Sequence, residues 1–85
     1  MENNSALSDS QKEALALTTM RLMLQQYSEK HHIPFDDAFF QFSTSAAYPA
    51  LFDYETEIWK EGPDYLMDIF TEALSLNAHK NKVPA

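Results

Sequence analysis

Residues 10–30 read SQKEALALTTMRLMLQQYSEK, a segment in which large apolar side chains recur at alternating spacings of three and four. This spacing places them on one face of an α-helix and leaves polar residues on the other. The predicted apolar face comprises Leu17, Met20, Leu24 and Tyr27, widened by Ala16, Leu22 and Met23. Ser10 with Glu13 matches a capping box at a helix start, and Pro34 disfavours helix directly before it. We therefore expect a long helix over residues 10–31.

A second helix is predicted over residues 34–43. Asp36 and Asp37 would lie in its first turn, where the free amide groups favour negative charge. Apolar residues at three- and four-residue spacing form one face of this helix, namely Phe35, Ala38, Phe39 and Phe42. That face is either part of the core or one wall of a partner groove. We expect the core, because a short chain needs its aromatic residues to build one.

Two further helices are predicted in the second half of the chain. One, over residues 49–60, would carry a proline at its first position, although residues 54–59 also alternate like a short strand. Gly62 is the only glycine, and Pro63 follows it. The pair matches a left-handed cap followed by a helix with proline first, which predicts a fourth helix over residues 63–77.

Composition favours a single all-α domain, a compact bundle of about four helices. The 85 residues suffice for one core but not for two, and one glycine with four prolines supplies too few turns for an all-β fold. We expect a flexible amino terminus over residues 1–8, a helical domain over 9–77 and a flexible tail over 78–85. The lack of cysteine, of a signal-peptide pattern and of a long apolar run favours a cytoplasmic protein that does not enter a membrane.

The chain is acidic, with 13 acidic residues, six basic residues and a formal net charge of -7. A field of this sign repels phosphate backbones and anionic lipid headgroups, so direct binding to nucleic acid or to a membrane is disfavoured. The acidity either keeps the protein soluble or attracts a basic partner. Solubility is the commoner reason on small proteins.

The carboxy-terminal half contains the segment that we expect to bind a partner. Its carboxylates cluster around a single cation, Lys60, and comprise Asp53, Glu55, Glu57, Glu61, Asp64 and Asp68. Like charges four apart on a helix repel each other mildly, so such a band would favour a basic partner. The pairs with this spacing are Asp53 with Glu57, Glu57 with Glu61, and Asp64 with Asp68. The predicted contact residues are Tyr54, Glu57, Trp59, Glu61, Asp64 and Tyr65, the aromatic ones as anchors and the acidic ones as a rim.

Trp59 has two interpretations. It either anchors a partner or closes the core against the fourth helix, and the usual burial of tryptophan favours the core. If a partner does not dock on this segment, the exposed part of the first helix is the next candidate.

We recognise no catalytic machinery and expect neither a metal nor a cofactor. The chain has no cysteine and no Gly-x-Ser-x-Gly turn, and one glycine cannot build a phosphate-binding loop. The cluster that invites a metal hypothesis is His31, His32, Asp36 and Asp37. Adjacent histidines on a helix point about 100° apart, so we interpret this pair as solvated residues near the carbonyl end of the first helix. An enzyme is therefore not expected, and a metal-dependent one remains the last alternative.

Several motifs resemble a family of short bacterial helical proteins with an unassigned domain. The resemblance covers roughly residues 14–74 and rests on residues 31–40 (HHIPFDDAFF), Tyr54, Gly62 and residues 65–69 (YLMDI). Ile58 and Trp59 stand where the family has Leu-His, so a role of that histidine is not transferred. Members are often encoded beside genes for ADP-ribosyltransferase-like toxins. The resemblance thus implies a small helical accessory protein, with an antitoxin-like role as one version.

The sequence therefore predicts a small acidic protein-protein interaction module. Its partner is either another protein or a second copy of the chain, because the wide apolar faces of the first and fourth helices exceed what one small core covers. The alternatives are an antitoxin-like accessory that neutralises a co-encoded toxin and, last, the metal-dependent enzyme.

Overall fold

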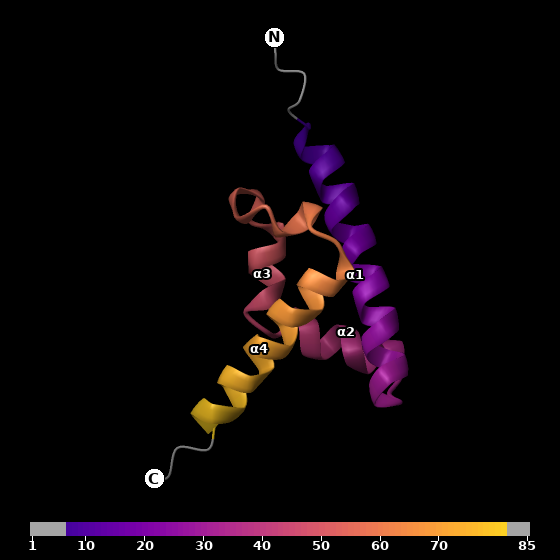
Figure 1. Cartoon of the computed structure of the whole chain (residues 1–85), viewed down its shortest axis with the longest axis vertical. Coiled ribbons are helices and arrows are strands. Elements are labelled where there is room, and N and C mark those ends of the chain that lie inside the picture. The colour runs from indigo at the N-terminus through magenta and orange to yellow at the C-terminus, as the bar shows by residue number, and fades with distance from the viewer. Residues whose placement is uncertain (1–6, 82–85) are drawn as a thin grey trace.

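The computed structural model describes residues 7–81 and shows an all-α bundle (Figure 1). Its α-helices are α1 (Asp9–His31), α2 (Phe35–Ser43), α3 (Ala47–Phe52) and α4 (Pro63–Asn81), and the short 3-10 helices η1 (Tyr54–Thr56) and η2 (Ile58–Lys60) connect α3 to α4. No strand occurs within residues 7–81, and the predicted all-α class is confirmed.

The start of α1 is capped by a different pair from the predicted Ser10 and Glu13. The Ser8 hydroxyl accepts a hydrogen bond from the Gln11 amide at 3.2 Å, and the Gln11 side chain accepts one from the Ser8 amide at 2.9 Å. Both pairs fit the capping pattern, but the earlier one also brings Asp9 into the first turn, where negative charge is favoured. The other end of α1, at His31, agrees with the prediction.

The buried face of α1 is narrower than the predicted apolar stripe. Ala16, Met23, Leu24 and Tyr27 are buried and Met20 is half-buried. Leu17 and Leu22, however, are 39% and 44% exposed. The reason is tertiary, because the contacts of α1 with α2, α4 and η2 leave these two leucines partly exposed.

The predicted helix over residues 49–60 is wrong in its second half. α3 begins earlier, at Ala47, and ends at Phe52, after which the backbone of Asp53 is extended. The Asp53 carboxylate accepts a hydrogen bond from the Glu55 amide at 3.2 Å, and the Thr56 hydroxyl donates one to the Ala50 carbonyl at 2.9 Å. Such side chain to backbone bonds compete with helix continuation. Glu57 then adopts a left-handed conformation with φ 61°, which ends any helical run.

The predicted glycine-proline corner is present. Gly62 has a φ of 98°, which favours glycine, and Pro63 is the first residue of α4. α4 continues past the predicted end at residue 77 to Asn81, so the fourth helix is longer than predicted. Residues 82–85 of the predicted flexible tail, and residues 1–6 of the predicted flexible amino terminus, lie outside the described part of the chain.

The core lies where α1, α2 and α4 meet. The Phe42 and Phe70 rings pack edge to face with centroids 5.3 Å apart, and the Tyr27 ring lies 4.8 Å from that of Phe70. Figure 1 shows α1 along one side of the bundle and the later half of α4 extending away from the other helices. The buried apolar residues are Ala16, Met23, Leu24, Tyr27, Ala38, Phe42, Ala47, Leu51, Ile58, Trp59, Leu66 and Phe70.

Within the described residues, none of the helices is both long enough and apolar enough to cross a lipid bilayer.

Candidate functional site

The aromatic anchor predicted at Trp59 is part of the core. Its side chain is 8% exposed, and its indole N–H donates a hydrogen bond to the Tyr54 carbonyl at 2.8 Å. The Lys12 ammonium lies 5.7 Å from the centre of the indole and 5.9 Å from that of the Tyr54 ring, within the range of cation–π attraction. η2, which carries Trp59, packs against α1. In this structure Trp59 therefore joins η2 to α1 and has little surface left for a partner.

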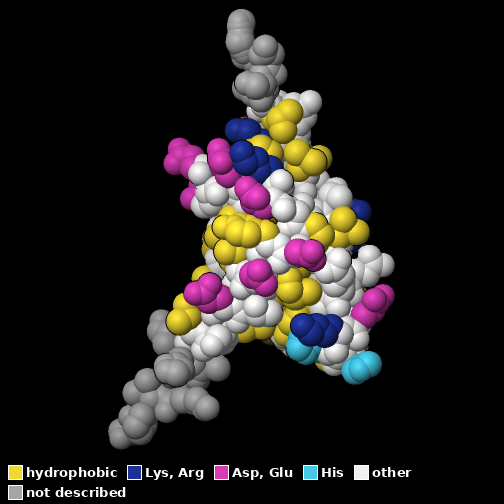
Figure 2. Space-filling view, viewed as in Figure 1, with side chains coloured by type: hydrophobic (Ala, Val, Ile, Leu, Met, Phe, Trp, Pro, Cys, Tyr) yellow, Lys and Arg dark blue, Asp and Glu magenta, His cyan; other side chains and the backbone are white. Residues whose placement is uncertain are grey.

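The other predicted contact residues lie around the corner between η1 and α4, but they do not form one surface with Trp59. Glu57, Glu61 and Asp64 are exposed, as is Tyr65 at 47%. Tyr54 is half-buried. Partial burial raises the pKa of its hydroxyl, and the negative charges of Glu13 and Asp9 raise it further. Figure 2 shows acidic side chains gathered at this corner, with hydrophobic side chains next to them.

The predicted like-charge pairs are mostly absent as helical neighbours. Because helix ends at Phe52 and two 3-10 turns follow, only Asp64 and Asp68 share an α-helix. Glu57 instead forms an exposed ion pair with Lys60, with 3.1 Å between carboxylate oxygen and ammonium nitrogen. The acidic corner is therefore less strained than the helical prediction implied, and the argument that it needs a basic partner is correspondingly weaker.

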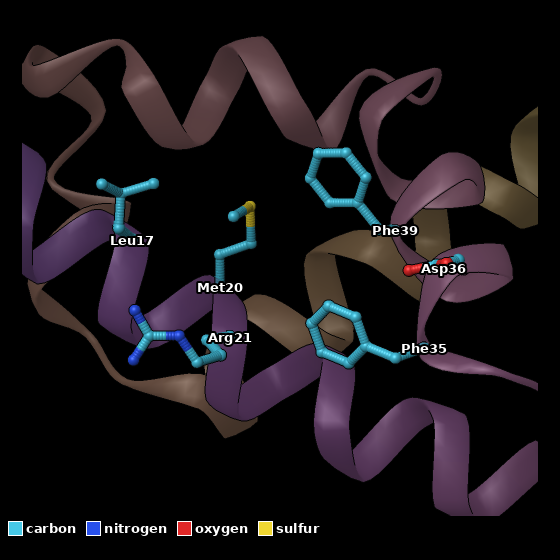
Figure 3. Close-up of a pocket in the computed structure, with 6 residues that line it drawn as sticks. All are labelled: Leu17, Met20, Arg21, Phe35, Asp36 and Phe39. Atoms are coloured by element: carbon cyan, nitrogen blue, oxygen red, sulfur yellow. The ribbon is translucent and has the colours of Figure 1, made fainter.

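Phe35 and Phe39, which we expected in the core, instead line a surface between α1 and α2, in keeping with the alternative of a partner groove. We call it the α1–α2 groove, an open pocket of about 330 Å³ lined by Leu17, Met20, Arg21, Phe35, Asp36 and Phe39. Figure 3 shows Leu17, Met20 and Arg21 on α1 facing Phe35, Asp36 and Phe39 on α2. Leu17, Phe35 and Phe39 are each 39% exposed. The lining is thus mainly apolar and accessible.

The groove follows from the way α2 packs on α1. α2 buries Ala38 and Phe42, which leaves the Phe35 and Phe39 side chains at the edge of the contact. These two residues are four apart on one helix, so their rings lie on the same side one turn apart. In Figure 3 both rings point toward Met20 of α1.

A hydrogen bond helps to hold the two walls at this separation. The Tyr27 hydroxyl of α1 donates to the Gln41 side-chain oxygen of α2 at 2.9 Å. A tyrosine hydroxyl is protonated at neutral pH, and burial raises the pKa of this one further, so the donor keeps its proton. The Tyr27 ring also packs on the buried Phe70, so this link is anchored in the core.

The groove carries one positive and one negative side chain, and they lie on opposite walls. Arg21 belongs to α1 and Asp36 to α2, and both are exposed. Neither forms an ion pair with another residue in the described part of the chain. Both charges are therefore available to a molecule that enters the groove.

The cluster of His31, His32, Asp36 and Asp37, for which we considered a metal and expected none, lies at the end of α1 and the start of α2. No group of three or more potential ligands among histidine, aspartate and glutamate is found in the part of the chain that the structure describes. His32 occupies the left-handed cap of α1 with φ 56°, and the His31 ring packs 4.3 Å from that of Tyr27.

The comparisons with protein-family models, with curated proteins and with solved structures gave no match. The resemblance to short bacterial helical proteins accordingly stays a prediction.

Proposed function

We propose that this chain is a protein-binding module that acts through the α1–α2 groove. The observation that carries the proposal is the exposure of Leu17, Phe35 and Phe39 around one open apolar pocket. The described part of the chain already has a core of twelve buried apolar residues without these three. Exposed apolar surface rimmed by polar side chains is typical of protein interaction sites.

The α1–α2 groove resembles a protein interface more closely than the acidic corner does. Interfaces place aromatic residues at a dehydrated centre and charged residues at a hydrated rim. The groove offers the rings of Phe35 and Phe39 at its centre, with Arg21 and Asp36 beside them. At the acidic corner the tryptophan is buried, and the role we propose there is long-range steering of a partner rather than contact.

The openness of the groove favours a protein partner over a small molecule. Ligand pockets usually enclose roughly 70–90% of the surface of a small molecule. A pocket between two helices that is open to solvent would leave much of such a ligand exposed, whereas it accepts the side chains of an apposed protein surface.

Photo-crosslinking from the groove tests the proposal. A photoreactive phenylalanine analogue is placed at Phe35, and in a matched variant at Leu22, which is similarly exposed at 44% but lies outside the groove lining. We expect protein adducts in irradiated cells from position 35 and few from position 22. Equal yields from both positions, or none from position 35, would overturn the proposal. An adduct with a toxin-like enzyme would support the antitoxin-like version.

A further inference from the structure

We infer that the α1–α2 groove binds the same groove of a second copy of this chain, related by a two-fold axis that runs along the groove. This inference rests on the proposed function and goes beyond it by naming the partner. In the dimer, Arg21 of each copy faces Asp36 of the other.

The distribution of charge in the groove is the first reason. A two-fold interface brings the same patch of two subunits together, and it exchanges the two walls of a groove when its axis runs along that groove. Because Arg21 lies on the α1 wall and Asp36 on the α2 wall, the rotation places each charge opposite its counterpart (Figure 3). A groove with the same charge on both walls would repel its own copy. This groove instead brings two oppositely charged pairs together, each formed by Arg21 of one copy and Asp36 of the other.

The apolar lining is complementary to itself in the same way. The α1 wall contributes the aliphatic side chains of Leu17 and Met20, and the α2 wall contributes the aromatic rings of Phe35 and Phe39. Exchanging the walls lays the rings of one copy against the aliphatic side chains of the other. Contacts between methionine sulfur and aromatic rings are favourable, and flexible methionine adapts to such surfaces.

The overall charge of -7 does not oppose this contact at short range. The groove lining contains one cation and one anion and is therefore neutral. The acidic residues between positions 53 and 68 belong to the η1–η2 segment and the start of α4, not to either wall of the groove. Repulsion between exposed charges is screened over about 8 Å at physiological ionic strength, which reduces the cost of bringing two copies together.

Sedimentation of the parent chain and of two charge-reversal variants tests the inference. The parent should pass from monomer to dimer as its concentration rises. R21E alone and D36R alone should each dimerise about tenfold more weakly or worse, because two pairs become repulsive at once. D36R also makes the chain less acidic, so a general effect of net charge would strengthen its association, and the inference requires the opposite.

An equimolar mixture of R21E and D36R is the decisive sample. In a mixed dimer the two introduced charges face each other with opposite signs, and the unchanged Asp36 of one copy faces the unchanged Arg21 of the other. The mixture should therefore regain dimerisation near the parent level, while each variant alone keeps its helical circular dichroism. A mixture no better than its components, or a parent that stays monomeric to millimolar concentration, overturns the inference.

The crosslinking from Phe35 separates this failure from failure of the proposed function. An adduct with twice the mass of the chain supports the second copy. An adduct with a different protein overturns the second copy and leaves the groove as a protein-binding site. Absence of any adduct overturns both, and this readout does not depend on the folding of either charge variant.

Discussion

The α1–α2 groove and the acidic corner between η1 and α4 both combine aromatic and charged side chains. The tryptophan of the corner is buried, whereas the phenylalanines of the groove are exposed. At the corner, Trp59 is 8% exposed, and its N–H bonds to the chain itself. In the groove, Phe35 and Phe39 are each 39% exposed. The 3-10 turns let the corner fold back on α1, whereas the regular spacing of α2 buries one set of side chains and leaves its neighbours outside. An aromatic residue among charged residues, such as Trp59, therefore indicates a binding site only when the local backbone leaves its side chain exposed.

Replacing Trp59 is the change with the largest expected effect. Trp59→Ala should lower the free energy of unfolding by about 3–5 kcal/mol, because it leaves a cavity between η2 and α1. Tyr65→Ala is the matched control, since Tyr65 is 47% exposed on the neighbouring α4 and its loss should cost about 0.5 kcal/mol or less. Chemical denaturation of both variants measures the difference. A stable Trp59→Ala variant that loses partner binding would contradict the comparison and restore the predicted anchor.

Gly62→Ala should have the next largest effect. The φ of 98° at Gly62 is unfavourable for residues with a side chain, although an added Cβ would meet no atom within 4 Å. The cost should therefore come from backbone strain alone, about 1–2 kcal/mol in the free energy of unfolding. The substitution is distant in sequence from the groove, so the folded variant should still dimerise like the parent. Loss of dimerisation by the folded variant would show that the Gly62-Pro63 corner affects the groove.

Tyr27→Phe should produce the smallest effect and concerns the groove. It removes the hydrogen bond to Gln41 that joins α1 and α2, which should cost about 1 kcal/mol of stability. Tyr48→Phe is the control, because the Tyr48 hydroxyl has no hydrogen bond recorded within the described residues. Equal denaturation midpoints for the two variants would indicate that the Tyr27 bond does not hold the walls.

The same tyrosine predicts how stability depends on pH. Burial raises the pKa of Tyr27 in the folded state, so the unfolded chain loses this proton first as pH rises. Its contribution is complete below the unfolded pKa of about 10 and is lost as pH rises through the higher folded value. The parent should therefore lose stability more steeply above pH ~10 than Tyr27→Phe does. If the free energies of unfolding of the parent and of Tyr27→Phe fall in parallel as pH rises, the Tyr27 hydroxyl is solvated.

The sequence by itself determined those features that depend on residues close together in the chain. The periodicity of residues 10–31, the stop before Pro34 and the Gly62-Pro63 corner each rest on a few neighbouring residues, and each is present in the structure. They follow from hydrogen-bond capping, a restricted proline φ and a left-handed glycine, whose energies do not depend on distant segments.

Only the tertiary structure decided which apolar side chains are covered. The spacing of Leu17, Phe35 and Phe39 places them on apolar helical faces, but it cannot say how far along those faces another helix extends. Trp59 is buried because η2 lies against α1, a contact between segments more than twenty residues apart. Burial depends on the arrangement of all the helices together, and periodicity reports only the direction in which each side chain leaves its own helix. For this reason the helices could be predicted largely from sequence, whereas the choice between core and groove for Phe35 and Phe39 could not.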